Sequence, residues 1–394
     1  MTQACLKLGV VGLGRAFSLM LPTFVNDARV QLVAACDPRE AARTQFAHDF
    51  SPLVFEDVHA LAACPDINAV YIASPHQMHA EHVEIVASHG KHILLEKPMA
   101  ISMQECDAMI RACERSQVRM VIGHCHSFDQ PYLDARALIA SGQLGEVKML
   151  HALNFTDFLY RPRRPEELDT RQGGGVVFSQ GAHQIDVLRM LAGSEVRAVR
   201  SVMGQWDASR PTEGVYSALF WFENGAFATA TYSGYAHFDS DIWMGGYGEM
   251  GALKDPQQYG GARKKLAECA PGDESALKAK ATYGGEGFAL QQPPFDQAFQ
   301  HFGPIIVSCE KGDVRPLPDR IEIYGDRVHQ TLDLGKPLFP RKEVIDELEH
   351  AVCMNQPTLH DGHWARNTLK VCLAMLHSAK TGKDVLLHEF QENL

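Results

Sequence analysis

The sequence predicts an α/β protein in two domains: a parallel sheet covered by helices, and then an α+β domain with a large, mainly antiparallel open sheet. The chain has 394 residues, too many for one ordinary hydrophobic core. Up to about residue 125, short apolar runs alternate with helical patterns, which is typical of parallel β-α units. Farther along, longer runs alternate polar and apolar residues. We therefore expect domains at 1–125 and 126–394.

The expected strands of the first domain are apolar runs that end at turn residues. They are Leu6–Val11, Val30–Cys36, Ala69–Ala73, Lys91–Leu95 and Arg119–Gly123. Helical patterns lie between them, at Met78–His89 and Ser102–Arg115. Ser102 and Glu105 have the spacing of a capping box, which predicts a helix that begins just after Pro98.

The second domain opens with strand patterns that are separated by turn signals, including Asn224-Gly225. These strands are expected at Val147–Thr156, Val196–Trp206, Val215–Phe222 and Ala226–Tyr235. The segment 239–294 is rich in Gly, Lys and Gln and has weak periodicity, so we interpret it as an insertion. Two helical patterns close the chain, at Lys342–Met354 and about His363–Thr381.

The composition restricts the function classes. A net charge of −11 argues against nucleic acid or an anionic membrane as a partner, because both require a basic surface. Ten cysteines without a short-spacing framework, and no signal-peptide pattern at the start, lead us to expect a cytoplasmic protein with reduced thiols. An anionic substrate would need a local basic cluster.

A nucleotide motif follows the first expected strand. Gly12-Leu13-Gly14 leads into a helical pattern, and in a Rossmann domain such glycines let the backbone approach a pyrophosphate at the helix N-terminus. The third fingerprint position is Phe17 rather than Gly or Ala, so the motif is incomplete. Asp37 ends the second strand, where an acid can bind the adenosine ribose and repel a 2′-phosphate. Arg39 could instead pair with that phosphate, so NAD is preferred and NADP stays open.

Lys97 is the expected base. It follows the fourth strand at the carboxyl edge of the sheet, where open α/β sheets bind ligands. A partly desolvated lysine could take the hydroxyl proton of an alcohol. We expect Pro98 to fix the backbone and Glu96 to orient the ammonium.

A second group of residues is the run Gly173-Gly174-Gly175 followed by His183 and Asp186. The glycines permit close backbone approach to a ligand or to the other domain. If the segment is helical, His183 and Asp186 share a face, and the acid could orient the imidazole. We therefore add His183 and Asp186 to Lys97 as expected catalytic residues.

Together, in this order and spacing, these motifs, with Ser74-Pro75 and His79, resemble the Gfo/Idh/MocA oxidoreductase family. The resemblance implies an NAD-dependent dehydrogenase, with Lys97 and His183 at the reacting alcohol and homo-oligomers (dimers or tetramers) built through the C-terminal sheet. The residues expected to bind the cofactor are Gly12, Gly14, Arg15, Ala16, Phe17, Asp37, Arg39, Ser74, Pro75, His79, Glu96 and Lys97. Family members that act on sugars or inositols often have Asp where this chain has Ser179, which puts a sugar substrate in doubt.

Four arginines lie in the stretch 160–171, which leads to the glycine run Gly173-Gly174-Gly175. Guanidinium groups bind carboxylates in pairs of hydrogen bonds, so we expect an anion clamp here. The residues expected to bind substrate are Arg161, Arg163, Arg164, Arg171, Ser179, His183 and His237. Within the family, GLGRAF, RPRRPEELDTRQGGGVVFSQGAHQID and HFDSD are most similar to phthalate 4,5-cis-dihydrodiol dehydrogenases. That implies oxidation of cis-4,5-dihydro-4,5-dihydroxyphthalate to 4,5-dihydroxyphthalate.

Three alternatives stay open. An inositol, sugar or sugar-acid dehydrogenase of the same family is one, and a non-catalytic NAD-sensing regulator is another. The third concerns His124 and His126, whose spacing is compatible with a metal pair. Because no third ligand is near them in the expected strand, we expect no metal.

Overall fold

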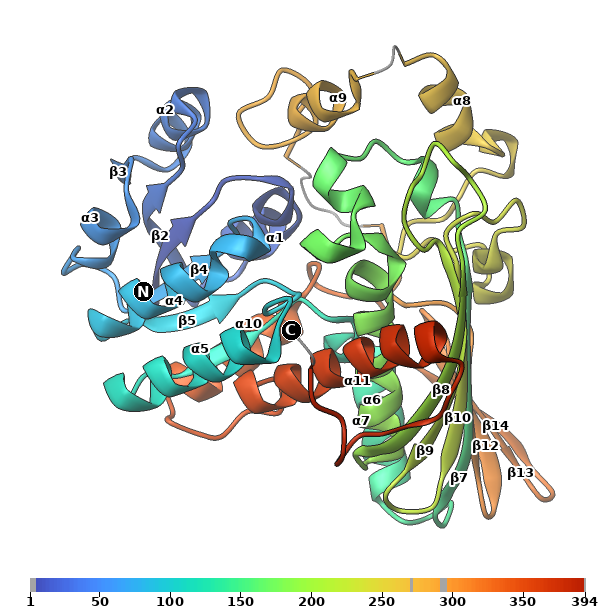
Figure 1. Cartoon of the computed structure of the whole chain (residues 1–394). Helices are drawn as coiled ribbons and strands as arrows, with labels where there is room; N and C mark the ends of the chain where they lie inside the picture. Colours follow the sequence, from blue (N-terminus) through green and yellow to red (C-terminus); the bar gives the residue numbers. More distant parts are fainter. Residues whose placement is uncertain (1–4, 270–271, 291–295, 393–394) are drawn as a thin grey trace. The chain divides into compact units, whose positions relative to one another are not determined.

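The computed structural model describes residues 5–269, 272–290 and 296–392 (Figure 1). The chain divides into two compact units. One comprises the described residues of Met1–His124, Ser275–Phe295 and Leu338–Asn367, and the other those of Cys125–Glu274, Asp296–Pro337 and Thr368–Leu394. The first boundary lies next to the expected division at residue 125. Two later segments return to the first unit, which local sequence patterns do not reveal.

The sheet of the first unit is parallel throughout, in the order β3-β2-β1-β4-β5-β6. Its strands are β1 (Leu6–Val11), β2 (Val30–Cys36), β3 (Leu53–Phe55), β4 (Ala69–Ile72), β5 (His92–Leu95) and β6 (Met120–Ile122). β4 is buried at every residue, so both of its faces are covered. The short strand β3 was not expected, because two of its three residues are exposed.

The helices of this unit are α1 (Arg15–Asn26), α2 (Glu40–Phe50), α3 (Val58–Ala62), α4 (His79–Ser88), α5 (Met103–Ser116), α10 (Lys342–Val352) and, except for its first residue, α9 (Glu274–Lys280). The Ser102 hydroxyl accepts a hydrogen bond from the Glu105 backbone N–H at 3.2 Å. The Glu105 carboxylate in turn accepts from the Ser102 hydroxyl at 2.9 Å. The expected start of α5 is therefore confirmed. α10 packs beside β6 although more than 200 residues separate them.

The second unit contains a nine-stranded sheet in the order β14-β13-β12-β11-β7-β10-β9-β8-β15. Its strands are β7 (Val147–Phe155), β8 (Val196–Gly204), β9 (Val215–Phe222), β10 (Phe227–Ser233), β11 (Ile305–Cys309), β12 (Gly312–Pro316), β13 (Arg320–Gly325), β14 (His329–Asp333) and β15 (Val385–Leu386). β7 and β10 pair in parallel, and the other neighbours are antiparallel. The expected fold class is confirmed.

Helices α6 (Gln130–Ala140) and α7 (Ala182–Ala192) lie along one face of this sheet (Figure 1). α11 (Gly362–Thr381) forms where the last helical pattern was expected. The expected insertion is divided: α8 (Gly261–Ala267) belongs to the second unit, whereas the described residues from Ser275 onward belong to the first. Its residues 270–271 and 291–294 lie outside the described residues. Among the described helices, none has the length and apolarity needed to cross a membrane.

Candidate active site

The carboxyl end of β1 has the features of a pyrophosphate site. Gly12 has a φ of +92°, which an L-residue rarely adopts. α1 begins directly after Gly14, and its first turn has neither a side-chain cap nor an acidic residue. A Cβ atom added at Gly14 would meet no atom within 4 Å, so the space in front of the helix start is open. Uncapped N–H groups and the helix dipole suit a phosphate anion.

Asp37 and Arg39 form one ion pair beside this turn. The buried Asp37 carboxylate accepts hydrogen bonds from the Leu13 backbone N–H at 2.7 Å and the Arg39 backbone N–H at 2.8 Å. It also accepts from Arg39 Nε at 3.0 Å and Nη2 at 3.1 Å. Asp37, which favours NAD, and Arg39, which could favour NADP, are therefore bound to each other. The acid lies at the end of β2, as required for a ribose contact.

Phe17 does not act as a cofactor ligand through its side chain. It is fully buried and packs edge-on against Tyr283 and Phe46, with ring centroids 5.2 and 5.8 Å away. A bulky residue fits at the third fingerprint position because it fills the core behind α1. Arg15 is exposed and Ala16 is half-buried at the helix start, on the expected side of the motif.

Both ring nitrogens of His79 face backbone carbonyl groups, which corrects the expectation that this side chain contacts the cofactor. Its Nδ1 lies 3.1 Å from the Met99 carbonyl oxygen and its Nε2 lies 3.0 Å from the Ser74 carbonyl oxygen. Burial lowers the pKa of His79 to about 4. The imidazole thereby joins the end of β4, where Ser74-Pro75 begins the next turn, to the segment after Lys97.

Lys97 follows β5 at the carboxyl edge of the sheet and is half-buried. Glu96 is buried, and its carboxylate accepts a hydrogen bond from the Tyr71 hydroxyl at 2.5 Å and one from the Lys97 backbone N–H. Burial raises the pKa of Glu96, and the charge of Lys97 opposes that rise. The charge of Lys97 therefore acts on the Glu96 carboxylate, and the expectation that Glu96 orients the ammonium stays a prediction.

His183 lies on α7 in the second unit and is buried. Its Nδ1 accepts a hydrogen bond from the His126 backbone N–H at 3.3 Å. In the neutral imidazole the proton is then on Nε2, which makes that nitrogen the donor. Phe302 packs against the imidazole with ring centroids 5.1 Å apart. The structure therefore gives His183 a fixed tautomer and an apolar wall.

Asp186 does not orient His183 directly. Its carboxylate accepts hydrogen bonds from the Ser127 and Thr368 hydroxyls, each at 2.6 Å, and lies 3.8 Å from Arg189 Nη1. The bond to Ser127 holds the turn His126–Phe128 against α7, and that turn supplies the N–H to His183. The spacing predicted a shared face correctly, but the acid acts through the neighbouring turn.

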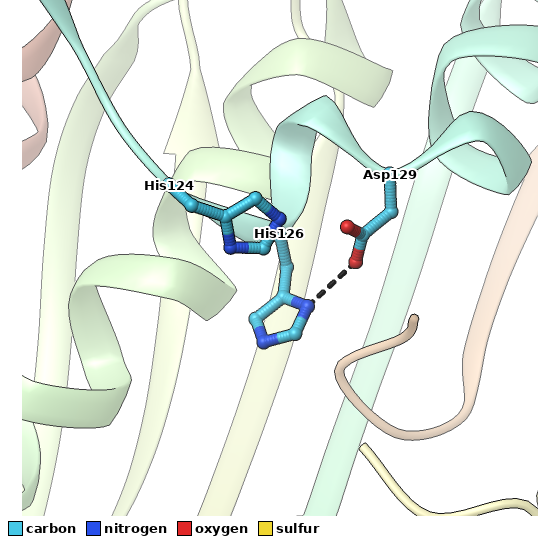
Figure 2. A group of neighbouring side chains, drawn as sticks. All are labelled: His124, His126 and Asp129. Atoms are coloured by element: carbon cyan, nitrogen blue, oxygen red, sulfur yellow. Dashed lines mark hydrogen bonds and ion pairs between the residues drawn. The ribbon is translucent and has the colours of Figure 1, made fainter. Parts of the chain in front are cut away.

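His126 is held by two carboxylates, as Figure 2 shows for Asp129. Its Nδ1 lies 2.6 Å from Asp129 and its Nε2 lies 3.3 Å from Glu249. Burial opposes a charge here, but the two acids raise the pKa of His126 above its usual value. One ligand-type atom each from His124, His126 and Asp129 lies within 4.8 Å of the others. Because both ring nitrogens of His126 face carboxylates, we interpret the group as an ion pair and propose no metal.

The four arginines differ in their partners. Arg163 stacks on the Phe158 ring at 3.6 Å and donates to the Phe158 carbonyl oxygen at 2.8 Å. Its buried Nε finds no hydrogen-bond partner in the described structure. Burial lowers the pKa of Arg163 to about 10, so the guanidinium stays charged at neutral pH. Arg161 lies beside it and faces Asp157 at 3.3 Å and Glu249 at 3.9 Å.

The other expected substrate residues have local roles. Arg164 lies 3.1 Å from Glu166, and the exposed Arg171 pairs with Asp169 at 2.9 Å. Ser179 donates to the Gly175 carbonyl oxygen, and His237 is exposed after β10. The glycine run packs closely against the preceding arginine-rich segment, because a Cβ atom at Gly174 would lie 2.6 Å from the Glu166 carbonyl oxygen.

Several residues of this group were not expected from the sequence. Phe302 contacts His183, and Tyr232 stacks on Phe302 with centroids 6.1 Å apart and reaches the Phe158 ring at 6.5 Å. Rings thus connect His183 to the phenylalanine under Arg163. Gln180 has a buried amide oxygen that finds no hydrogen-bond partner among the residues that the structure describes. No local signal marks these residues, because β10, α7 and the segment before β11 meet only in the folded sheet.

Comparisons with known proteins agree with this arrangement. Residues 6–124 match the model of an oxidoreductase family with an NAD-binding Rossmann fold, and residues 132–254 match the GFO/IDH/MocA C-terminal domain. The chain is 46% identical over 377 residues to 1-carboxy-3-chloro-3,4-dihydroxycyclohexa-1,5-diene dehydrogenase from Comamonas testosteroni, covering 95% of each protein. It is 30% identical over 201 residues to an inositol 2-dehydrogenase from Pseudomonas syringae pv. syringae, which is 50% of this chain and 57% of that protein.

A crystal structure of a putative dehydrogenase from Bordetella bronchiseptica is 41% identical, with a TM-score of 0.91 over 97% of this chain and 99% of the other. The chain therefore belongs to the Gfo/Idh/MocA family of oxidoreductases and uses NAD. The expected family, enzyme class and cofactor are confirmed, and the alternative of a non-catalytic regulator is set aside.

Proposed function

We propose that this Gfo/Idh/MocA oxidoreductase oxidises a carboxylated cyclohexadiene cis-diol to the corresponding aromatic diol. The observation that carries the proposal is Arg163, a half-buried arginine whose buried Nε is unpartnered and which has, among the described residues, no carboxylate within salt-bridge distance. A buried charge is costly unless it is paired, so a ligand carboxylate is its natural partner. The Comamonas testosteroni relative supports the diol class, because its name specifies a carboxylated cyclohexadiene diol.

The roles of the residues follow from their chemistry. Lys97 accepts the proton of the reacting hydroxyl. His183 donates a hydrogen bond from Nε2 to a substrate oxygen, since its Nδ1 is already an acceptor. Bound NAD supplies the hydride acceptor. The oxidised carbon is then a ketone; the adjacent ring carbon loses its proton and the ketone oxygen gains one, which restores aromaticity and makes the overall oxidation strongly favourable.

The number of carboxylates distinguishes two diols. The phthalate-derived cis-4,5-diol carries two, and the diol named for the Comamonas relative carries one. Arg161 already faces Asp157 and Glu249, whereas Arg163 has no acid partner among the described residues. One uncompensated guanidinium favours one carboxylate, and the phthalate diol requires Arg161 to exchange partners. Sugar acids would also use Arg163, so they belong in the same comparison.

The test measures NADH formation, by absorbance, with each member of a substrate panel. It contains a monocarboxylated cyclohexadiene cis-diol, the phthalate-derived diol, the uncarboxylated cis-diol, myo-inositol and a sugar acid. We expect turnover of the carboxylated diols, with the largest kcat/KM for the monocarboxylate. An equal kcat/KM for the uncarboxylated diol would contradict the role of Arg163. Preferential turnover of inositol or a sugar acid would contradict the diol.

We also propose that the chain forms homo-oligomers through the open face of the nine-stranded sheet. Val202, Phe227, Ile306 and Tyr324 are exposed there and share one face by strand register. Exposed apolar patches of this kind commonly mark protein interfaces. Light scattering should give a dimer or tetramer mass. Ile306→Lys should lower that mass, and a monomeric wild-type protein would contradict the proposal.

A further inference from the structure

Arg39 has a hydrogen-bond acceptor for each of its guanidinium N–H groups. Nε and one Nη2 hydrogen go to the Asp37 carboxylate, and the other Nη2 hydrogen goes to the Leu13 carbonyl oxygen at 2.9 Å. Nη1 donates to the Thr282 hydroxyl and to the Tyr283 carbonyl oxygen, both at 3.4 Å. An arginine has five such donors, so none is left for a ligand.

The Nη1 acceptors belong to a segment distant in sequence, residues 282–288, which we call the strap. The Tyr283 ring packs against Phe17 and Phe288, each with centroids 5.2 Å apart. The Tyr283 backbone N–H donates to the Ser18 hydroxyl at 2.9 Å, and its hydroxyl donates to Asp49 at 2.6 Å. The strap is therefore fastened to α1 and α2 by both rings and hydrogen bonds.

Gly284 sets how closely the strap approaches α2. Its φ is +78°, and a Cβ atom there would lie 2.7 Å from the Ala42 Cα atom. A side chain at this position would both strain the backbone and collide with the helix. The contact is thus specific to glycine, and it offers a means of loosening the strap without altering Arg39 or Asp37.

We propose that the strap is a cofactor-specificity element that keeps Arg39 from binding the 2′-phosphate of NADP. A 2′-phosphate next to Asp37 would need a free guanidinium to offset the carboxylate. With Nη1 held by Thr282 and Tyr283, and the remaining donors held by Asp37 and Leu13, Arg39 offers no such group. The strap and the ion pair therefore exclude NADP together, through the same arginine.

The inference concerns cofactor binding alone, so it does not rest on the proposed diol substrate. It can be tested with NADH and NADPH in the absence of any alcohol, by the change in their fluorescence on binding. The other substitutions are made in a chain that already carries Asp37→Ser. This change removes the repelling charge and two of the five acceptors of Arg39. Three acceptors then remain, and two of them belong to the strap.

In that background, Gly284→Ala should tighten NADPH binding by about a further tenfold, the value of a charge-assisted hydrogen bond. NADH binding should change little. Gly261→Ala is the matched control, because it lies in the same insertion and its added Cβ meets no atom within 4 Å. Adding Arg39→Gln should abolish the gain. Hydrogen exchange at residues 282–288 reports whether the strap has loosened.

Thr282→Val keeps the strap in place and removes only the hydroxyl that accepts from Arg39. It should tighten NADPH binding by about twofold to threefold in the same background. A loosened strap with an unchanged NADPH affinity would overturn the proposal, as would a gain that persists without Arg39. If Gly284→Ala does not fold, an unchanged NADPH affinity in Thr282→Val overturns it.

Discussion

Replacing Arg163 by Gln removes the guanidinium that we assign to the substrate carboxylate. Truncating one partner of a buried, hydrogen-bonded charge pair costs about 2–5 kcal/mol. Because the guanidinium is half-buried and stacked on Phe158, we take a value near the lower end of this range, about 2.7 kcal/mol, which corresponds to about a 100-fold rise in KM for the carboxylated diol. The carboxylate takes no part in the bond changes, so kcat should stay within a few-fold of wild type.

The assay is initial-rate NADH formation over a range of diol concentrations at saturating NAD. Arg171→Gln is the matched control, because Arg171 is exposed and its salt-bridge partner among the described residues is Asp169, and such surface pairs contribute little. Loss of the stacking on Phe158 should also lower the free energy of unfolding by about 0.5–2 kcal/mol. Thermal denaturation separates that effect from binding. An unchanged KM in a folded Arg163→Gln variant would refute the assignment.

Three further predictions concern other groups. Lys97→Ala should abolish turnover and leave the NADH dissociation constant unchanged. The control variant Lys148→Ala, which removes an exposed ammonium, should remain active. Turnover by Lys97→Ala would contradict the role of Lys97 as the base. Asp186→Asn should lower the free energy of unfolding by about 2 kcal/mol in urea titrations, because two hydroxyls and Arg189 lose a charged partner. The depressed pKa of His79 means that the unfolded chain binds the proton first as pH falls. Stability should therefore be complete above about pH 6.5 and fall by roughly 3 kcal/mol towards pH 4, and His79→Gln should remove that share of the pH dependence.

Local patterns were sufficient for five of the six described strands of the first sheet and for four of the nine described strands of the second. β1, β2 and β9 begin and end at the expected residues, and the capping box placed the start of α5 to within a residue. These segments carry their own signal, because apolar periodicity and cap chemistry depend on neighbours in the sequence. β3 and the strands β11–β15 were missed. β3 and β14 are short and largely exposed, so their residues have no strong alternation.

The sequence by itself determined which chemical groups are present: the glycine turn after β1, the acid at the end of β2, the lysine after β5, and the histidine on α7. Only the tertiary structure decided what each charged group faces. It paired Arg39 with Asp37, turned Glu96 towards Tyr71, and gave Asp186 to Ser127 and Thr368. Within the described part of the chain, it also left Arg163 without an acid at salt-bridge distance, while Arg171 found one two residues away. The reason is physical: the pKa and the binding role of a charged side chain depend on burial and on partners that are distant in sequence, and the residue type fixes neither.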